Sequence, residues 1–247
     1  MGRHGPFDVI YFIATPDSYD DEGYQRAYVE GIWTLCEVIG LLGDDPPWPT
    51  DRGAGAGGAS AAPRLIFVSS TGVYGQEQGE WVDETSPTEP TSYTGRRLLE
   101  AEQIVAAATA GGRVQGISLR LGGIYGPGRD MLIARVQAGA PCHAEPVRYT
   151  NRIHEDDAVG ALVHLGAIEA PAAVYNGVDH EAAADCDVAD FIAERLGLPR
   201  PERRRSGNAP LVGVRGGNKR VSSERLRDSG YEFAFPTFRE GYAALLG

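Results

Sequence analysis

Hydroxyl-bearing side chains follow an apolar run near the middle of the chain. The run Leu65–Val68 has the β-rich composition of a buried strand, and Ser69-Ser70-Thr71-Gly72-Val73-Tyr74-Gly75 comes directly after it. Parallel α/β sheets place their chemistry at the carboxyl ends of strands. We therefore expect these hydroxyls to reach a ligand, although hydroxyl side chains can also end a strand by bonding the local backbone.

A tyrosine and a cation follow about twenty residues later. Tyr93 and Arg97 are four residues apart, so a helix would place them on one face. A tyrosine, with a pKa of about 10, can exchange protons near neutrality only if a nearby cation stabilises its phenolate. The pair therefore indicates acid–base chemistry, with a serine hydroxyl holding the reacting oxygen. An ordinary packed aromatic at a helix start is the alternative for Tyr93.

The segments that would position these residues alternate between strand and helix patterns. Continuous apolar runs predict strands over 8–14, 65–68, 114–121 and 174–176, and apolar stripes with a period of three to four residues predict helices over 23–41, 91–108 and 156–170. Such alternation is typical of an α/β fold with a wound parallel sheet.

Composition excludes several other classes of protein. The chain has 247 residues, with 42% hydrophobic residues and a formal net charge of -11, which disfavours a nucleic-acid partner. No apolar run is long enough to span a membrane. The cysteines, Cys36, Cys142 and Cys186, lie far apart without a CxxC pair, so we expect neither disulfides nor a metal site. A reducing cytoplasm is the expected location.

Several motifs together resemble the NAD-dependent epimerase/dehydratase group of the extended and atypical short-chain dehydrogenase/reductases. The motifs are Phe67–Gly75, Asp83-Glu84 and Pro90 before Tyr93, Arg120–Gly128, Ile153–Ala158, Tyr175-Asn176-Gly177 and Asn218–Val221. The resemblance implies a Rossmann-like doubly wound parallel sheet and an NAD or NADP cofactor. It also implies a small-molecule substrate, either a nucleotide sugar or a small carbonyl or alcohol compound.

The resemblance assigns roles position by position. Ser70 orients the substrate, Tyr93 donates or accepts the proton, and Arg97 stands where the family has a lysine. The implied cofactor contacts are Ala14, Thr15, Ser69, Tyr93, Arg97, Gly122, Gly123 and Ile124, and the implied substrate contacts are Thr71, Tyr125 and Arg129. Turn formation is an equal alternative for residues 122–129. His154 is expected to tie the sheet to a second lobe. Asp156 and Asp157 are expected to cap a helix and to interact with its dipole, rather than to act as paired catalytic acids.

Three departures from the family pattern affect these roles. Arg97 keeps the charge of the family's lysine but has a larger, planar head. If the helix is registered on Glu102-Gln103 instead, the tyrosine and lysine positions fall on Thr94 and Leu98, which leaves no catalytic pair. Tyr28 stands where the family often has an asparagine, three residues before Gly31.

Two domains are expected. Residues 1–178 would form a partial Rossmann-like domain, with 43–63 as a flexible Gly-, Pro- and Ala-rich loop. The GAGAGG within this loop follows a helix and precedes a strand, the reverse of a dinucleotide-binding loop. Residues 179–247 would form a small α-rich substrate lobe. It would contain a helix over 188–196, a basic loop over 200–205 and two short helices near Ser222 and Pro236.

The family's GxxGxxG turn does not occur before the strand at Asp8. We therefore expect an N-terminally truncated sheet that lacks the first three strands, or roughly 60 residues. The strand at Asp8 would then expose an apolar edge, which invites aggregation or a partner such as a second copy in a homodimer. A start placed downstream of the true one and a genuine remnant both account for this, and we favour the former because the other motifs are intact.

Two alternatives to an NAD(P)-dependent oxidoreductase stay open. The chain could be a non-catalytic dinucleotide-binding or regulatory protein, which Arg97, Tyr28 and the absent glycine turn favour. It could also be a nonfunctional fragment, which predicts poor solubility and no cooperative unfolding.

Overall fold

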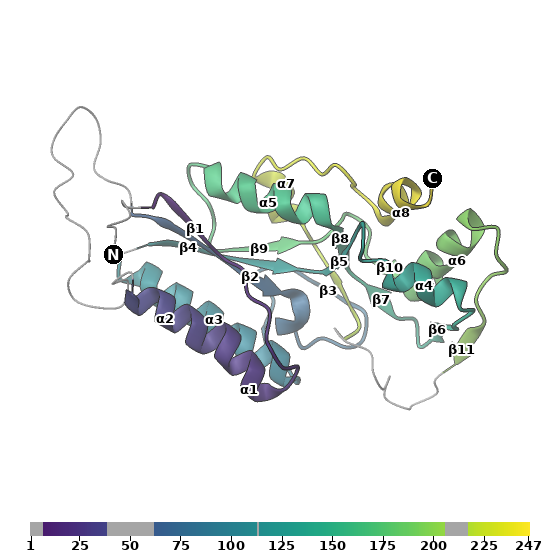
Figure 1. Ribbon diagram of the computed structural model, residues 1–247, viewed down its shortest axis with the longest axis horizontal. Helices are drawn as coiled ribbons and strands as arrows, with labels where there is room; N and C mark the ends of the chain where they lie inside the picture. Colours follow the sequence, from purple (N-terminus) through teal and green to yellow (C-terminus); the bar gives the residue numbers. More distant parts are fainter. Residues whose placement is uncertain (1–6, 39–61, 113, 206–216) are drawn as a thin grey trace.

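A four-stranded parallel sheet forms the centre of the computed structural model, which describes residues 7–38, 62–112, 114–205 and 217–247 (Figure 1). Its strands are β1 (Val9–Phe12), β2 (Arg64–Ser70), β4 (Gln115–Leu121) and β9 (Val174–Gly177), in the order β1-β2-β4-β9. The register pairs Phe12 with Phe67, Ser70 with Leu121, and Leu121 with Gly177. The strands therefore end at one edge, where the hydroxyl-rich segment begins.

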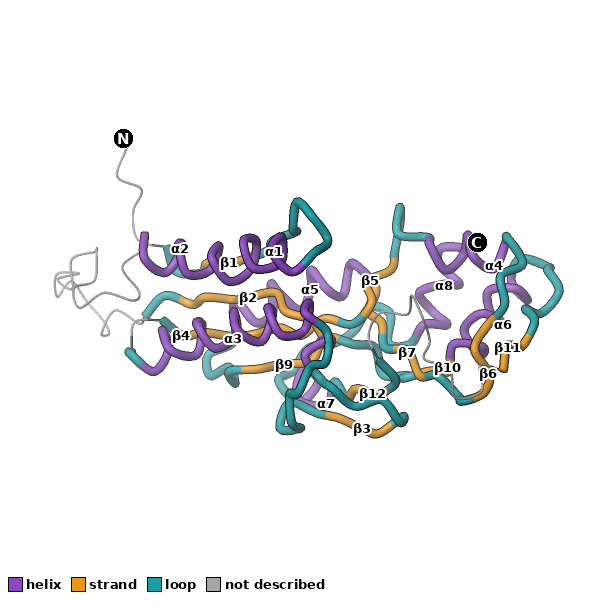
Figure 2. The backbone as a smooth tube through the Cα atoms, turned by 90° about the horizontal axis from the view of Figure 1, so that it is seen from below, coloured by secondary structure: helices purple, strands orange, loops and turns teal. Residues whose placement is uncertain are grey.

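Helices cover both faces of this sheet (Figure 2). One face carries α1 (Asp21–Tyr24), a π-helical segment η1 (Gln25–Glu30), α2 (Gly31–Val38) and α3 (Tyr93–Ala110), and the other carries α5 (Glu155–Ala167). The side chains of strand β2 point alternately to the two faces of the sheet. Leu65 and Phe67 pack with the helices of the first face, and Ile66 packs with α5. The expected doubly wound parallel α/β fold is confirmed, with a π-helical segment inside the expected first helix.

Short strand pairs and short helices form the C-terminal lobe and join it to the sheet. The pairs are β3 (Glu80–Val82) with β12 (Lys219–Val221), β5 (Gly123–Tyr125) with β8 (Arg152–His154), β7 (Tyr149–Thr150) with β10 (Ala183–Ala184), and β6 (Cys142–Glu145) with β11 (Arg203–Arg205). The remaining helices are η2 (Thr71–Val73), α4 (Met131–Gln137), α6 (Asp185–Arg195), α7 (Glu224–Asp228) and α8 (Phe238–Leu246). The expected basic loop over 200–205 is wrong for Arg203–Arg205, which form β11 and pair with β6, while residues 200–202 are a loop. Arg203 also binds Asp190.

The lobe has its own apolar core. It joins residues of β5, α4 and β6 to residues of α6 and α8: Tyr125, Ile133, Val136, Cys142, Val188, Ile192, Phe238 and Tyr242. These elements come from both sides of residue 178. The sequential division into 1–178 and 179–247 therefore does not coincide with the two cores, and it stays a proposal.

A disulfide corrects the expectation that the cysteines are unpaired. Cys142 of β6 and Cys186 of α6 are bonded across 44 residues of sequence, while Cys36 is free and buried. Spacing along the chain could not reveal the pair, because only the packing of α6 against β6 brings the two together. Within the described residues no cluster of side chains could hold a metal ion, and no helix is long and apolar enough to cross a membrane.

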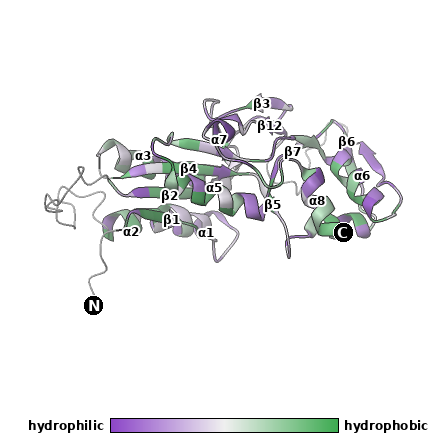
Figure 3. Ribbon diagram, turned by 90° about the horizontal axis from the view of Figure 1, so that it is seen from above, coloured by the Kyte–Doolittle hydropathy of each residue, from purple (hydrophilic) through white to green (hydrophobic). Residues whose placement is uncertain are grey.

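Strand β1 lies at an edge of the sheet (Figure 3). Tyr11 of this strand is 42% exposed, and Ile13, just after the strand, is 64% exposed. Apolar side chains are therefore exposed at this edge, and the expected absence of three further strands stays a prediction. The expected loop 43–63 lies outside the described residues except for its last two.

Candidate functional site

The hydroxyl-rich segment forms a tight turn at the end of β2. Ser70 is the last residue of the strand, and its Oγ accepts a hydrogen bond from the Gly72 N–H at 3.1 Å, which caps the short helix η2. Ser70 is half-buried, whereas Thr71 is buried. The Ser70 hydroxyl therefore lies at the carboxyl edge of the sheet with its donor hydrogen uncommitted by this bond.

The first turn of α3 packs directly against this segment. A Cβ atom on Gly95 would lie 2.4 Å from the carbonyl oxygen of Gly72, a distance that no side chain could occupy. Ser92 begins the helix, because its Oγ accepts from the Gly95 N–H at 3.1 Å. The fold thus brings the turn after Ser70 and the helix start that carries Tyr93 into backbone contact.

Tyr93 and Arg97 both hold the segment that follows β1. The Tyr93 hydroxyl donates to the carbonyl oxygen of Tyr19 at 2.7 Å. The Arg97 guanidinium makes two bonds to Asp21, at 2.8 and 2.9 Å, and another to Glu100 at 2.9 Å. Hydrogen bonding to Asp21 accordingly raises the pKa of Arg97 and lowers that of Asp21. In this structure the Arg97 charge is balanced by carboxylates.

The positions of the two possible registers of this helix have different surroundings, and the choice between the registers stays a prediction. Leu98 is 6% exposed and belongs to the apolar core, so a cation could not replace it without burying its charge. The Thr94 hydroxyl bonds the neighbouring Ser92. Only the Tyr93–Arg97 register places a tyrosine and a cation on the outward side of α3.

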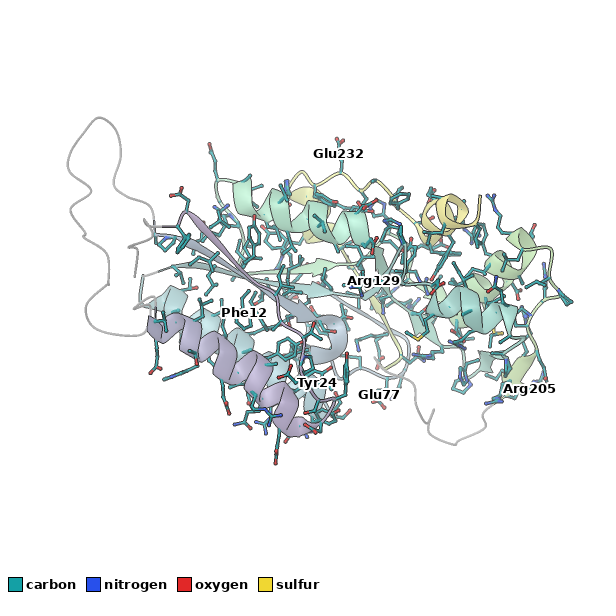
Figure 4. All side chains as sticks on the ribbon, in the orientation of Figure 1. Phe12, Tyr24, Glu77, Arg129, Arg205 and Glu232 are labelled. Carbon is teal, nitrogen blue, oxygen red and sulfur yellow. A yellow bond between two sulfur atoms is a disulfide. The ribbon has the colours of Figure 1, made fainter. Side chains whose placement is uncertain are left out.

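A group of tyrosines lies beside the end of β1. The Tyr28 hydroxyl donates to the carbonyl oxygen of Ala14 at 3.1 Å, and burial raises the pKa of Tyr28. Tyr24 is 5.3 Å from the Tyr28 ring and 5.6 Å from the Tyr93 ring, measured between centroids. Figure 4 shows the side chain of Tyr24 on the face of the sheet that α1 covers. Tyr28 therefore occupies the space beside Ala14 and Thr15, where cofactor contacts were expected.

Sequence reasoning missed a buried polar network behind this turn. The Ser69 Oγ donates to Glu102 Oε1 at 2.6 Å, and Arg120 Nη2 forms an ion pair with Glu102 Oε2 at 2.6 Å. Arg120 Nη1 donates to the Tyr74 hydroxyl at 2.9 Å, and that hydroxyl donates to Asn176 Oδ1 at 2.9 Å. The signal in the sequence was Arg120, the charged residue of strand β4, whose other residues are uncharged.

This network fixes both ends of the segment from Ser69 to Tyr74. Ser69 is 4% exposed with its hydroxyl committed to Glu102, so it holds the turn in place, and its cofactor contact stays a prediction. Lys219 adds a bond from its Nζ to the carbonyl oxygen of Tyr74 at 2.9 Å, and burial lowers the pKa of Lys219 to about 8.

The glycine-rich segment after β4 connects the sheet to the lobe. Gly122 and Gly123 donate to the carbonyl oxygens of Gly177 and Asn151, and Ile124 continues into β5. A Cβ atom on Gly122 would meet Asn151 at 2.9 Å. A structural role in this turn is therefore evident, and the cofactor contacts of these residues stay predictions.

The expected substrate contacts differ in their surroundings. Tyr125 is 4% exposed and stacks on Tyr242 at 4.5 Å, so it lies within the core of the lobe. The Arg129 side chain is 58% exposed and lies 3.6 Å from Glu155 near the junction of sheet and lobe (Figure 4). Of these two residues, only Arg129 is open to a ligand in this structure.

His154 joins the sheet to the segment between α7 and α8, in line with the expected tie to the second lobe. Its ring packs on Phe235 at 3.9 Å between centroids, and its Nδ1 accepts from the Asp156 N–H, so His154 caps α5. The expectation that Asp156 and Asp157 cap this helix is wrong, but both lie in its first turn, where their charges interact favourably with the helix dipole as expected. Asp157 is fully buried and accepts from the backbone N–H groups of Ala234 and Phe235.

Comparison with known proteins agrees with this architecture. Protein YeeZ of Escherichia coli K12 is 34% identical over 186 residues, which cover 72% of this chain and 61% of YeeZ. A Streptomyces protein named 3-diazoavenalumate denitrifying reductase is 30% identical over 267 residues, covering 93% of this chain and 85% of that protein. The chain therefore spans about three fifths of YeeZ.

Solved structures and a family model complete the comparison. A Methylobacillus flagellatus protein described as an NAD-dependent epimerase/dehydratase is 34% identical, with a TM-score of 0.66 over 91% of this chain and 72% of its own. The human epimerase family protein SDR39U1, solved with NADPH, shares the fold at 16% identity, with a TM-score of 0.73 over 98% of this chain and 83% of its own. The model of the NAD dependent epimerase/dehydratase family matches residues 4–176, so the chain belongs to that family.

Proposed function

We propose that this chain carries the proton-transfer and substrate-orienting half of an NAD(P)-dependent oxidoreductase. The contact between Gly72 and Gly95 carries the proposal, because it brings the Ser70 turn against the helix start that bears Tyr93 and Arg97. Relatives named as reductases support it, among them a 2'-dehydrokanamycin reductase that is 33% identical over 113 residues. The substrate is a nucleotide sugar or a small carbonyl or alcohol compound.

The three side chains divide the work of the proposed reaction. The Ser70 hydroxyl donates to the reacting oxygen and holds it, while the Tyr93 phenol gives or takes a proton at that oxygen. The Arg97 guanidinium stabilises the phenolate that forms. A bound nicotinamide supplies or accepts the hydride. Tyr93 and Arg97 must first leave Tyr19 and Asp21, and this exchange costs little because the bonds are solvent-exposed.

The described residues fit only one end of a dinucleotide. Tyr93 and Arg97 are suitable partners for a nicotinamide ribose. The β1–α1 connection does not suit a pyrophosphate, because Asp20 caps the helix and Asp21 and Glu22 occupy its first turn, where an anion would be repelled. We derive no contact to the phosphates from these residues, and NAD and NADP stay equal alternatives.

Turnover tests the proposal directly. NADH or NADPH oxidation would be followed with a panel of sugar-nucleotide and small carbonyl substrates for the chain and for Tyr93→Phe, Ser70→Ala and Tyr24→Phe. We expect Tyr93→Phe and Ser70→Ala to lose at least a hundredfold in kcat, in the range of general acid–base catalysis. Tyr24→Phe, which alters a neighbouring ring of the same cluster, should keep activity. Unchanged turnover in Tyr93→Phe would show that the proton passes elsewhere.

Two substitutions of Arg97, one that keeps the charge and one that removes it, provide a second test. Arg97→Lys keeps the charge but loses the paired bonds to Asp21, so it should retain or increase turnover. Arg97→Met removes the charge and should reduce turnover and shift the basic limb of the pH profile upward. Equal activity in both variants would exclude a role for the charge.

A non-catalytic binding protein is the second candidate function. It is favoured by the balanced charge of Arg97 and by Tyr28 beside Ala14, both of which occupy the expected reaction centre. A protein of this kind would bind a nicotinamide dinucleotide without turnover on any substrate of the panel. The cytoplasmic location and the homodimer remain predictions, and the disulfide is more typical of oxidising compartments.

A further inference from the structure

The Tyr74 side chain ties the turn that carries Ser70 to two strands of the sheet. Tyr74 directly follows the short helix η2 and is 2% exposed. Its hydroxyl accepts a hydrogen bond from Arg120 Nη1 on β4 at 2.9 Å and donates one to Asn176 Oδ1 on β9 at 2.9 Å. The C-terminal end of the turn can therefore move only if these buried bonds break.

Asn176 extends this tie to the C-terminal segment. The residue is fully buried, and its Oδ1 accepts from Tyr74. Its Nδ2 donates to the carbonyl oxygen of Ser222 at 3.0 Å, and its backbone N–H donates to Glu84 Oε1 at 2.8 Å. Glu84 Oε2 in turn lies 3.7 Å from Arg225 Nε of α7, which packs beside β9 (Figure 2). One residue of β9 thus joins the turn to the residues between β12 and α7.

The N-terminal end of the same turn is held by a second buried bond. The Ser69 Oγ donates to Glu102, and Glu102 forms an ion pair with Arg120. This is the same guanidinium that donates to Tyr74, so one arginine acts on both ends of the segment. Ser70 lies between the two held ends, and side chains behind the turn therefore set the position of its backbone.

The network supplies directed bonds rather than stability alone. Replacing a buried ion pair by apolar residues of similar volume is often neutral or stabilising, so stability does not by itself explain the pair of Glu102 and Arg120. Buried polar networks whose members are paired fix one geometry. Burial raises the pKa of Tyr74, so its phenol keeps the proton that it donates to Asn176 at neutral pH. A fixed geometry is what an orienting hydroxyl on the neighbouring turn requires.

We propose that Tyr74 and Asn176 are positioning residues for the Ser70 hydroxyl, through the buried hydrogen bonds that join its turn to the segment between β12 and α7. The inference rests on the proposed function, in which that hydroxyl holds the reacting oxygen. Both residues are almost inaccessible, so they act through the turn and not on the substrate. A displacement of about 1 Å at a reacting group can cost about a hundredfold in rate while the fold persists.

A double-mutant cycle with Ser70 tests the proposal. The values of kcat and KM would be measured on the full chain for Tyr74→Phe, Ser70→Ala and the double variant, with a substrate that the unmodified chain turns over. We expect Tyr74→Phe to lower kcat about tenfold with KM nearly unchanged, and to cause no further loss when Ser70→Ala is present. Asn176→Ala should behave in the same way. Losses that multiply in the double variant would overturn the proposal, because Tyr74 would then act independently of Ser70.

Tyr175→Phe is the matched control. Tyr175 precedes Asn176 on β9 and is 3% exposed, and its hydroxyl accepts from the Ala172 N–H at 2.8 Å, so this substitution also removes a buried bond. Its ring belongs to the core on the α5 face of the sheet, away from the turn. Tyr175→Phe should lower the melting temperature but leave kcat unchanged. An equal loss of kcat in Tyr175→Phe and Tyr74→Phe would assign the effect to general destabilisation and would overturn the proposal.

Amide hydrogen exchange provides a measurement that needs no turnover. The Gly72 N–H donates to Ser70 Oγ, so its exchange rate reports on the turn. In NMR of the full chain, Tyr74→Phe should speed the exchange of Gly72 about tenfold, and Tyr175→Phe should leave it unchanged. Unchanged exchange in Tyr74→Phe would overturn the inference whatever the turnover. Faster exchange in a chain that turns over no substrate would overturn the proposed function, and would leave Tyr74 and Asn176 as the residues that fix the turn.

Discussion

Gly95 of α3 lies so close to Gly72 that a Cβ atom would be 2.4 Å from the Gly72 carbonyl oxygen. The helix start that carries Tyr93 is therefore seated on the turn that carries Ser70. The approach requires a residue without a side chain at position 95, and it determines how near the proposed acid–base group can come to the proposed orienting hydroxyl.

Gly95→Ala tests the importance of this approach. Helix propensity alone predicts a gain of about 1 kcal/mol, but the added methyl group also meets Pro90 at 2.6 Å. We expect overpacking to prevail, with a net loss of about 1 to 3 kcal/mol in the free energy of unfolding and reduced turnover. Urea denaturation provides the measurement, and Gln103→Ala, on the exposed side of the same helix, is the control. If Gly95→Ala increased the free energy of unfolding, α3 could move away from the Gly72 turn without loss of stability, and the close approach would not be important.

The buried ion pair between Glu102 and Arg120 should contribute far more to the free energy of unfolding than the exposed ion pair between Glu100 and Arg97. Both side chains are nearly inaccessible, at 7% and 6%, so Glu102→Ala leaves a buried guanidinium without its carboxylate. We expect a loss of about 3 to 5 kcal/mol in the free energy of unfolding. Glu100→Ala removes the exposed partner of Arg97 and should change stability by about 1 kcal/mol or less. Similar losses in the two variants would contradict the buried network as an anchor.

Asp179 should make stability fall as the pH rises. Burial raises its pKa in the folded chain to about 7 from an ordinary value of 3.8, so the folded state holds this proton more tightly than the unfolded state. The contribution is fully present below about pH 4 and is lost as the pH rises to 7, with a slope of up to about 1.4 kcal/mol per pH unit.

The comparison for this pH effect is Asp179→Asn. Its free energy of unfolding relative to the unmodified chain should increase between pH 4 and 7, as measured by denaturant titration at each pH. For Asp228→Asn, a substitution at an exposed position, the free energy of unfolding should change with pH in the same way as it does for the unmodified chain. A constant difference for Asp179→Asn would show that the carboxyl group ionises normally.

The disulfide between Cys142 and Cys186 should stabilise the lobe. Closing a loop of 44 residues is worth up to about 4 kcal/mol in the chain-entropy model. Addition of a reductant should therefore lower the melting temperature of the chain, while the Cys142→Ala/Cys186→Ala variant should melt lower and not respond to the reductant. An unmodified chain that does not respond to the reductant, and that shows three free thiols when titrated after denaturation, would show that the pair is reduced.

The sequence by itself determined the sheet, its covering helices and the family. Apolar runs and helical stripes are local patterns set by burial, so the strands around Ile10, Ile66 and Ile117 and the helix that begins at Tyr93 could be located within a few residues. The motif around Ser70 could be placed at a strand end for the same reason.

Only the tertiary structure decided which side chains meet. The pairing of Ser69 with Glu102, of Arg97 with Asp21, and of Cys142 with Cys186 joins residues 33, 76 and 44 positions apart. Such contacts depend on how helices and strands pack, which no local pattern encodes. The alternation of a strand turned Ser69 into the interior and left Ser70 at the edge, so two adjacent serines have different surroundings.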